Sequence, residues 1–256
     1  MSDARRETFE VGGRTRIELN LPSGEAVFVP GEQGKVEVQV EGYHAEVFLI
    51  EQVGGRIVLR TPGRLSSRWD SFDVSVRMPE GADLEVKAAS ADVGVELALG
   101  SLSADLASGD LRAQKIEGSA TVETASGDVE LGEVGGRLEV GTASGDVRLG
   151  EGRNRTAVST ASGEARLGSV LGALVVTTQS GGIEVEHYAG DDLECNSTSG
   201  DVRVGLPPGR DLDVDLNTVS GEIRSDFSPE GGDGATARLN VKTISGDISL
   251  VRAAGR

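Results

Sequence analysis

Apolar and polar side chains alternate along most of the chain. Leu138, Val140 and Thr142 fall on one side of an extended backbone and Glu139 on the other, and the same alternation resumes around Arg148. A period of two residues is typical of a β-strand with one buried face. The 3.6-residue period of an amphipathic helix is absent from this part of the sequence. The pattern therefore predicts short strands joined by turns.

One motif recurs along the chain at a fixed distance. Copies of Ser-Gly-Asp or Ser-Gly-Glu begin at Ser108, Ser126, Ser144, Ser162, Ser199, Ser220 and Ser245. Ser90-Ala-Asp and Ser180-Gly-Gly are degenerate copies. The spacing is 18 residues from Ser90 to Ser180, and then 19, 21 and 25. Such self-similarity indicates a repeat architecture.

Other positions are fixed relative to each serine. The residue four places before it is apolar at Val122, Val140, Val158, Val176, Cys195, Leu216 and Val241. The residue three places after it is apolar at Leu111, Val129, Val147, Ala165, Ile183, Val202, Ile223 and Ile248. A hydroxyl stands two places before it at Thr124, Thr142, Thr160, Thr178, Ser197, Thr218 and Thr243. Each repeat therefore holds two strands, which flank the Ser-Gly-Asp turn; a third short side, such as Glu133-Val134, is the alternative.

A glycine column marks the second turn of each repeat, ten residues after the serine. It contains Gly100, Gly118, Gly136, Gly172, Gly190 and Gly209, with Asn154 as its one exception. Asparagine follows glycine in its readiness to adopt a positive φ. The column therefore predicts a demand for positive φ and not merely a limit on space.

An 18-residue unit with two short strands buries its apolar face only by stacking on its neighbours. We expect an all-β protein, a β-solenoid of about 18 residues per coil, and the crossover rule favours a right-handed parallel β-helix. The alternative is a meander of antiparallel hairpins with Ser-Gly-Asp in the loops. The extra residues of the longer repeats, Leu206–Arg210 and Ser228–Ala235, fall between coils, as loops of a stack should.

The first 89 residues are less regular and predict an N-terminal β cap. They contain Ser23-Gly-Glu25, so the repeat logic is already present. Strands are expected at 17–21, 36–40, 47–50, 57–59 and 72–76. The aromatic residues of this region fit a cap core better than a ligand platform; they are Phe28, Phe48, Trp69 and Phe72. The predicted organisation is a cap over 1–89, continuous with Ser-Gly-Asp repeats over 90–256.

The segment Val76-Arg-Met-Pro-Glu-Gly-Ala-Asp-Leu-Glu-Val86, followed by serial Ser-Gly-Asp-Val units, resembles the bacterial "putative adhesin" family of β-strand-repeat proteins. The opening Phe9-Glu-Val-Gly-Gly13 and the later Leu21-Pro-Ser-Gly-Glu25 are similar to the usual start of that family. The resemblance covers nearly the whole chain. It implies an envelope or surface association for some members and no established chemistry.

Charge narrows the range of partners. The 256 residues include 25 Lys and Arg against 42 Asp and Glu, a formal net charge of −17. Nucleic acids and anionic membrane surfaces both attract basic proteins, so neither is expected as a partner. The sequence shows no signal peptide and no apolar run long enough to span a membrane. As written, the chain is expected to be cytoplasmic, without membrane insertion.

Candidate chemistry is sparse. His44 and His187 are the only imidazoles and lie in no metal-binding pattern, and His187 with Tyr188 is expected at a solvated turn. Cys195 occupies the apolar column, so we expect a buried thiol and neither a disulfide nor a nucleophile. Without nucleophile elbow or phosphate loop, the sequence predicts no enzyme. A carbohydrate-active β-helix enzyme is the alternative, although the repeats hold few aromatic residues for binding sugars.

The strongest candidate for a binding edge is the acid of each Ser-Gly-Asp turn. This acidic column contains Asp92, Asp110, Asp128, Asp146, Glu164, Asp201, Glu222 and Asp247. Stacked like charges repel. We expect turn amides to relieve that repulsion, helped by the arginines two residues further on: Arg112, Arg148, Arg166, Arg203 and Arg224. Calcium, which prefers oxygen ligands, is the alternative and the only metal candidate; no other cofactor is expected.

These features favour a non-enzymatic structural or interaction module. It would be a rigid acidic rod that presents columns of Thr, Asp and Arg to an unknown protein or surface partner. Self-assembly into filaments is the alternative, because the C-terminal coil, Asn240 to Leu250, has only six residues after it to cover it.

Overall fold

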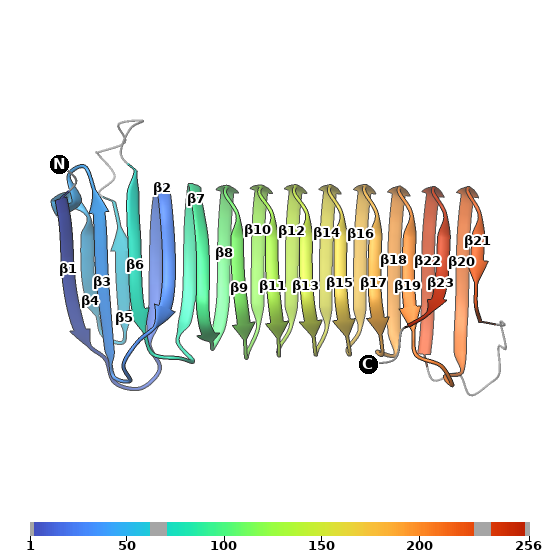
Figure 1. Ribbon diagram of the computed structural model, residues 1–256, viewed down its shortest axis with the longest axis horizontal. Coiled ribbons are helices and arrows are strands. Elements are labelled where there is room, and N and C mark those ends of the chain that lie inside the picture. The colour runs from blue at the N-terminus through green and yellow to red at the C-terminus, as the bar shows by residue number, and fades with distance from the viewer. Residues whose placement is uncertain (1–2, 62–70, 228–236, 254–256) are drawn as a thin grey trace. The chain divides into compact units, whose positions relative to one another are not determined.

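The computed structural model describes residues 3–61, 71–227 and 237–253. The chain forms two compact units, residues 1–130 and 131–256, and each is described by itself. Apart from one 3₁₀ turn, η1 (Ala45–Val47), the regular elements are strands (Figure 1). The predicted boundary near residue 89 stays a prediction; β7 (Asp83–Leu99) runs through it without a break.

In the second unit, each coil contributes two strands. One stack contains β12 (Leu138–Ser144), β14 (Thr156–Ser162), β16 (Leu174–Ser180), β18 (Asp192–Ser199), β20 (Leu212–Ser220) and β22 (Ala237–Ser245). The other contains β13 (Val147–Gly152), β15 (Ala165–Val170), β17 (Ile183–Tyr188), β19 (Val202–Leu206), β21 (Ile223–Ser225) and β23 (Ile248–Arg252). β11 (Val129–Val134) straddles the division between the units. All described pairings within this unit are parallel, which confirms the solenoid and excludes the hairpin meander. Its right-handed sense stays a prediction.

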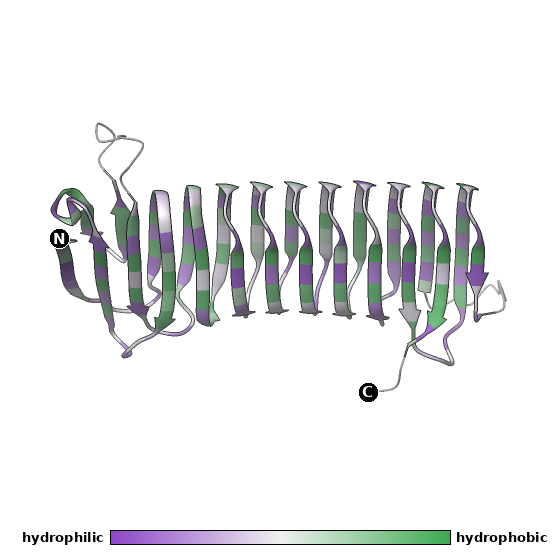
Figure 2. Cartoon of the chain, turned by 45° about the horizontal axis from the view of Figure 1, so that its top comes forward, coloured by the Kyte–Doolittle hydropathy of each residue, from purple (hydrophilic) through white to green (hydrophobic). Residues whose placement is uncertain are grey.

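The motif serines set the register. Ser144 lies opposite Ser162, Ser162 opposite Ser180, and Ser180 opposite Ser199. Stacking therefore places each column of the sequence in one row of the sheet. Figure 2 shows the alternation of hydrophobic and hydrophilic positions along the strands. The apolar column is buried from coil to coil: Val140 and Val158 are 2% exposed, and Val176 and Cys195 are 0% exposed.

The order of the coils in space differs from their order in sequence. β18 pairs with β22, and β22 pairs with β20, so the C-terminal coil lies between two earlier ones. The prediction that the coil from Asn240 to Leu250 ends the stack was therefore wrong. Its position explains one long connection: residues 207–211 after β19 skip one coil position, which β22 and β23 later fill. The other predicted insertion, Ser228–Ala235, lies outside the described residues.

The first unit begins with the same kind of coil. β2 (Arg16–Pro30) and β7 each run around a whole coil in a single strand, and they pair in parallel from Arg16 to Phe28. β8 (Ser101–Ser108), β9 (Leu111–Ile116) and β10 (Ala120–Ser126) extend the stack. β8 pairs with both β7 and β10, and β9 pairs with β7.

On its other side, β2 carries a cap. β6 (Phe72–Met78) and β5 (Arg56–Arg60) both pair with β2 in parallel. β3 (Lys35–Gly42) then adds to β6, β1 (Asp3–Glu10) adds to β3, and β4 (Leu49–Val53) adds to β5, all as antiparallel strands. Phe28, Phe48 and Phe72 are at most 2% exposed, which confirms an aromatic cap core; Trp69 lies outside the described residues.

The motif glycines combine two demands. Gly163 has a φ of 147°, and a Cβ there would lie 2.1 Å from the carbonyl oxygen of Gly145 in the neighbouring coil. Gly181 has a φ of 148°, with 1.9 Å to the carbonyl oxygen of Gly163. Only glycine satisfies both the backbone angle and the close stacking of the turns.

The second glycine column behaves differently, and the prediction for it was wrong. Of its seven positions, all described, only Gly209 has a positive φ. Space is the constraint at Gly190, where a Cβ would lie 2.1 Å from the carbonyl oxygen of Gly172. Asn154 fits this column through its side-chain Nδ2, which donates a hydrogen bond of 2.6 Å to the carbonyl of Gly135.

No helix among the described residues combines the length and the apolar character that crossing a bilayer requires.

Candidate functional site

The acidic column forms a chain of hydrogen bonds that runs from coil to coil. In the first unit, the Asp110 amide donates to Asp92 Oδ1 at 2.8 Å, and the Asp128 amide donates to Asp110 Oδ1 at 3.0 Å. In the second unit, the Glu164 amide donates to Asp146 Oδ1 at 2.9 Å. The carboxylates therefore cap turns, as expected, but each caps the turn of the next coil.

The reordered coils continue this pattern. The Asp247 amide donates to Asp201 Oδ1, and the Glu222 amide donates to Asp247 Oδ1, both at 2.8 Å. Glu222 is thus the last carboxylate of the second unit, and Asp247 lies between it and Asp201. Sequence order had placed Glu222 next to Asp201.

Arginines two residues further on neutralise part of the column. Arg112 lies 3.1 Å from Asp110, and Arg148 lies 2.9 Å from Asp146. Arg166 pairs with Glu164, and Arg224 pairs with Glu222. Arg203 is the exception, since its described partner is Glu184, at 3.8 Å. Four of the eight carboxylates of the column are therefore paired with one of these arginines.

Calcium at the acidic column stays a prediction. Among the described residues, no group of three or more His, Cys, Asp or Glu side chains is arranged to hold a metal ion. The carboxylates follow one another along the stack, and five turn amides occupy one oxygen of a neighbouring acid.

The column continues into the cap beyond the predicted residues. Glu25 lies opposite Asp92 on one side and opposite Asp73 on the other, and Asp73 lies opposite Glu41. These four carboxylates, Glu41, Asp73, Glu25 and Asp92, are here called the acidic row. Among the described residues, no Lys or Arg pairs with any of them. Glu25 was recognisable from its Ser-Gly-Glu triplet, whereas Asp73 and Glu41 join through strand pairings that leave no local mark in the sequence.

The threonine column is not presented to a partner, contrary to the prediction. Thr142 is 7% exposed, Thr160 is 3% exposed and Thr178 is 2% exposed. The Oγ1 atoms of these three residues are buried without a hydrogen-bond partner. In the last two coils the hydroxyls are bonded: Thr243 donates to the carbonyl of Gly200, and Thr218 donates to that of Gly246. The column belongs to the core.

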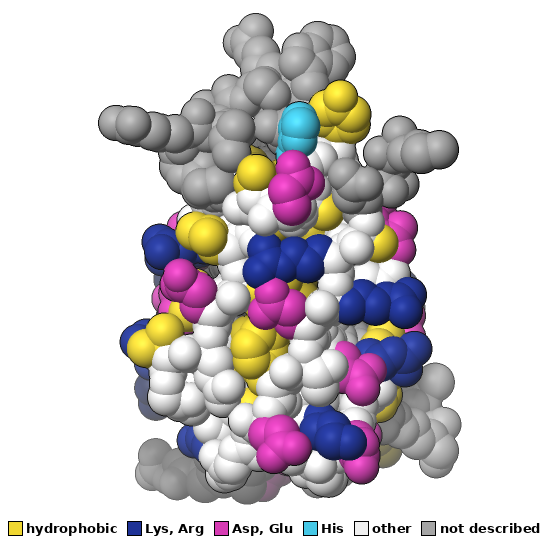
Figure 3. Space-filling model, turned by 90° about the vertical axis from the view of Figure 1, so that its left-hand side faces the viewer, with side chains coloured by type: hydrophobic (Ala, Val, Ile, Leu, Met, Phe, Trp, Pro, Cys, Tyr) yellow, Lys and Arg dark blue, Asp and Glu magenta, His cyan; other side chains and the backbone are white. Residues whose placement is uncertain are grey.

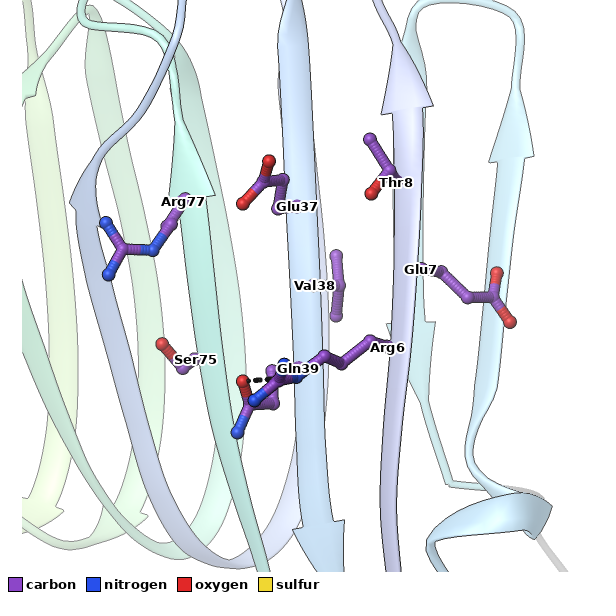
Figure 4. A pocket seen from close by; sticks show the side chains of 8 residues that line it. All are labelled: Arg6, Glu7, Thr8, Glu37, Val38, Gln39, Ser75 and Arg77. Atoms are coloured by element: carbon purple, nitrogen blue, oxygen red, sulfur yellow. Dashed lines mark hydrogen bonds between the residues drawn. The ribbon is translucent and has the colours of Figure 1, made fainter.

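A shallow groove of about 380 Å³ lies on the outer face of β1, β3 and β6 (Figure 4). Its lining includes Arg6, Gln39, Ser75 and Arg77. Arg6 Nε donates to Gln39 Oε1 at 2.9 Å. Among the described residues, Arg77 makes no ion pair. The groove adds polar contact surface beside the acidic row.

The remaining candidates for chemistry are structural. His44 precedes η1 in the first unit, and His187 lies on β17 in the second. His187 is half-buried in a strand and Tyr188 is 0% exposed, so the prediction of a solvated turn was wrong. Cys195 is 0% exposed as expected, and burial raises the pKa of its thiol to about 12. A thiol with that pKa is protonated at neutral pH and is a poor nucleophile.

The chain matches one family model and is similar to several solved structures. The model of the Toastrack DUF4097 family matches residues 15–251. A putative lipid binding protein from Parabacteroides distasonis is 16% identical, with 98% of this chain and 97% of that chain covered and a TM-score of 0.47. A putative adhesin from Bacteroides fragilis is also 16% identical, with 97% of both chains covered and a TM-score of 0.43. No curated protein matches the chain.

Proposed function

The chain belongs to this Toastrack family, and from that premise we propose that it is a non-enzymatic interaction module, an acidic β-solenoid that binds a protein or surface partner along its turn edge. The observation that carries the proposal is the coil-to-coil register of the acidic column. Five of the turn carboxylates accept a hydrogen bond from the backbone amide of the neighbouring turn, which supports outward groups that recur from coil to coil; they are Asp92, Asp110, Asp146, Asp201 and Asp247. Repeated, rigidly held groups offer a partner many equivalent contacts at little cost in side-chain entropy.

Charge determines which partner fits. A net charge of −17 steers basic surfaces toward the protein and repels acidic ones. Arginines offset much of the column, but the acidic row has no described cation. Among the described residues of the first unit, these four carboxylates of β3, β6, β2 and β7 lie in register without a paired Lys or Arg. A partner with a basic surface would gain most by contact there.

No catalytic role is assigned. The two imidazoles belong to different units, and Cys195 is buried. The carbohydrate-active alternative needs aromatic platforms, and Tyr188, one of the two aromatic residues of the repeats, is fully buried.

The test uses the whole chain and a fluorescent deca-arginine peptide, with anisotropy at physiological salt as the readout. The variant Glu25→Gln/Asp73→Asn removes two charges from the acidic row. The control Glu96→Gln/Glu123→Gln removes two exposed carboxylates of the same unit that lie outside the row. We expect the row variant to weaken binding about fivefold more than the control. Equal weakening would mean that only net charge matters and would overturn the turn edge as the binding surface.

A further inference from the structure

The coil formed by β20 and β21 is open on one side. Ile223 on β21 is 45% exposed, whereas its register partner Ile248 is 0% exposed. On β20, Val214 and Leu216 are half-buried, whereas their partners Leu239 and Val241 are 0% exposed. The inward-facing side chains of this coil are therefore more exposed than those of the coil with which it pairs.

The backbone of β20 is open at the same place. Among the described strands, this nine-residue strand pairs with β22 alone. No described strand pairs with the amide and carbonyl groups along its other side. An exposed edge next to apolar side chains is a template for strand addition.

We propose that this open coil docks on the open coil of a second copy of the chain, with β20 antiparallel to β20 of the copy, to form a closed two-fold dimer. Because both copies use the same surface, the exposed apolar side chains of one copy contact those of the other, and the two β20 edges pair with each other. This inference does not depend on what the turn edge binds.

The cap offers no matching surface for head-to-tail growth. β1 is also an edge strand, paired with β3 alone among the described strands. Where β20 carries Val214 and Leu216, β1 carries Arg5 and Glu7, which form an ion pair. Figure 3 shows basic and acidic side chains interspersed over this end of the first unit. Pairing β20 with β1 would bury charge against an apolar rim, so a filament is disfavoured and a dimer is favoured.

The sequence of β20 suits antiparallel self-pairing. A two-fold axis at Leu216 sets Asp215 opposite Asn217 of the copy and Asp213 opposite Val219 of the copy. No carboxylate then faces a carboxylate directly, although the strand carries two. Directly opposed like charges would destabilise such a pair.

The experiment is sedimentation equilibrium of the whole chain over a wide range of concentration. We expect a monomer–dimer equilibrium with a limiting mass twice the chain mass of 26.5 kDa. Asn217→Asp places two like-charge contacts in the dimer and should weaken it about tenfold, and Asn217→Lys should tighten it. Asn217 is exposed, so circular dichroism at low concentration should show both variants folded.

A matched control exists in an inner coil. The side-chain amide of Asn217 donates to Asp215, two residues earlier, and that of Asn196 on β18 donates to Glu194 in the same way. β18, however, is paired on both sides, with β16 and β22. Asn196→Asp and Asn196→Lys should leave dimerisation unchanged. A monomer at all concentrations, a mass above the dimer, or equal effects at Asn196 and Asn217 would each overturn the proposal.

Discussion

Two edge strands, β1 in the first unit and β20 in the second, meet the same physical problem in different ways. Each pairs on one side only among the described strands. β1 turns the Arg5–Glu7 ion pair toward the core side, and Arg5 also donates to the carbonyl of Phe48 at 2.6 Å. Inward-pointing charge on an edge strand discourages further pairing. β20 has Val214 and Leu216 at the comparable positions and lacks this protection.

The difference teaches that a repeat fold needs a separate solution at each end. The coil of β2 is covered by β5 and β6, and its inward residues Ile17 and Leu21 are 0% exposed. The coil of β20 repeats the sequence of an inner coil and therefore keeps the apolar column of an inner coil. Coils with the same apolar columns pack well between two neighbours, but such a coil leaves apolar side chains exposed where it has only one neighbour.

The largest effect on stability is expected at the glycine of the Ser-Gly-Asp turn, a turn that inner coils and the open coil both contain. Gly163→Ala meets both the positive φ and the carbonyl of Gly145, and should cost on the order of 4 kcal/mol in free energy of unfolding. Gly221→Ala, in the open coil, should cost less, because that coil has a neighbour on one side only and can shift. Urea unfolding of each variant measures both losses.

Gly141 is the control for the turn glycines. A Cβ at Gly141 meets no atom within 4 Å, and its φ is not positive. Gly141→Ala should therefore leave stability unchanged or raise it slightly.

Equal losses at Gly163 and Gly221 would show that the β20 coil is held as firmly as an inner one.

The second-largest effect is expected when a core side chain is truncated, which should cost more stability in an enclosed coil than in the open coil. Ile248→Ala removes a fully buried side chain and should cost about 3 kcal/mol. Ile223→Ala, in the adjoining strand at 45% exposure, should cost about 1 kcal/mol or less at concentrations where the chain is monomeric. Thermal unfolding at low concentration tests the pair, and similar costs would contradict an open coil.

Sequence reasoning was most successful where neighbouring coils are adjacent in sequence. The serine spacing predicted the register Ser144–Ser162–Ser180 and the buried position of Cys195. It failed for the order of the last coils, because Ser220 and Ser245 carry the same columns and fit either position in the stack. Only the length of the connections could have signalled an exchange of coils, and the sequence does not say which coil a long connection skips.

Two errors concern the site and have distinct physical origins. Asn154 suggested a positive φ, but asparagine also supplies an amide that reaches a neighbouring carbonyl, and that is the role it plays. The predicted acidic column was incomplete, because Asp73 and Glu41 continue it through the cap strands β6 and β3. The pairings of the cap strands, parallel for β6 with β2 and antiparallel for β3 with β6, have no periodic signature in the sequence, so no column predicts them.

Replacing a threonine of the column by valine should change the stability in opposite directions in an inner coil and in the open coil. Thr160 Oγ1 is buried without a partner, so Thr160→Val should stabilise the protein by about 1 kcal/mol. Thr218 Oγ1, in the open coil, donates to the carbonyl of Gly246 at 3.1 Å, so Thr218→Val should destabilise it by up to about 1 kcal/mol. Differential scanning calorimetry gives both signs, and stabilisation by both variants would argue against a bonded hydroxyl in the open coil.

The smallest expected effect is a pH dependence of stability at β7 of the first unit, the strand that pairs with β2. A hydrogen bond from Arg16 lowers the pKa of Glu85. Burial alone would raise the pKa of Asp83, but hydrogen bonds from Arg14 and Ser101 outweigh it and lower this pKa as well. A folded-state pKa below the unfolded value gives stability that is present above the unfolded pKa and is lost as the pH falls through the folded one.

Acidification from pH 5 toward pH 3 should therefore cost these two groups about 1 kcal/mol together, since partly exposed ion pairs contribute little. Asp83→Asn/Glu85→Gln should flatten that part of the stability curve, measured by urea unfolding at a series of pH values. Asp213→Asn, which removes the partner of Arg238 in the open coil, is the control and should leave the slope as it is. A slope that changes only in the control would place the acid-sensitive contacts at β20 and reverse the contrast between the two edges.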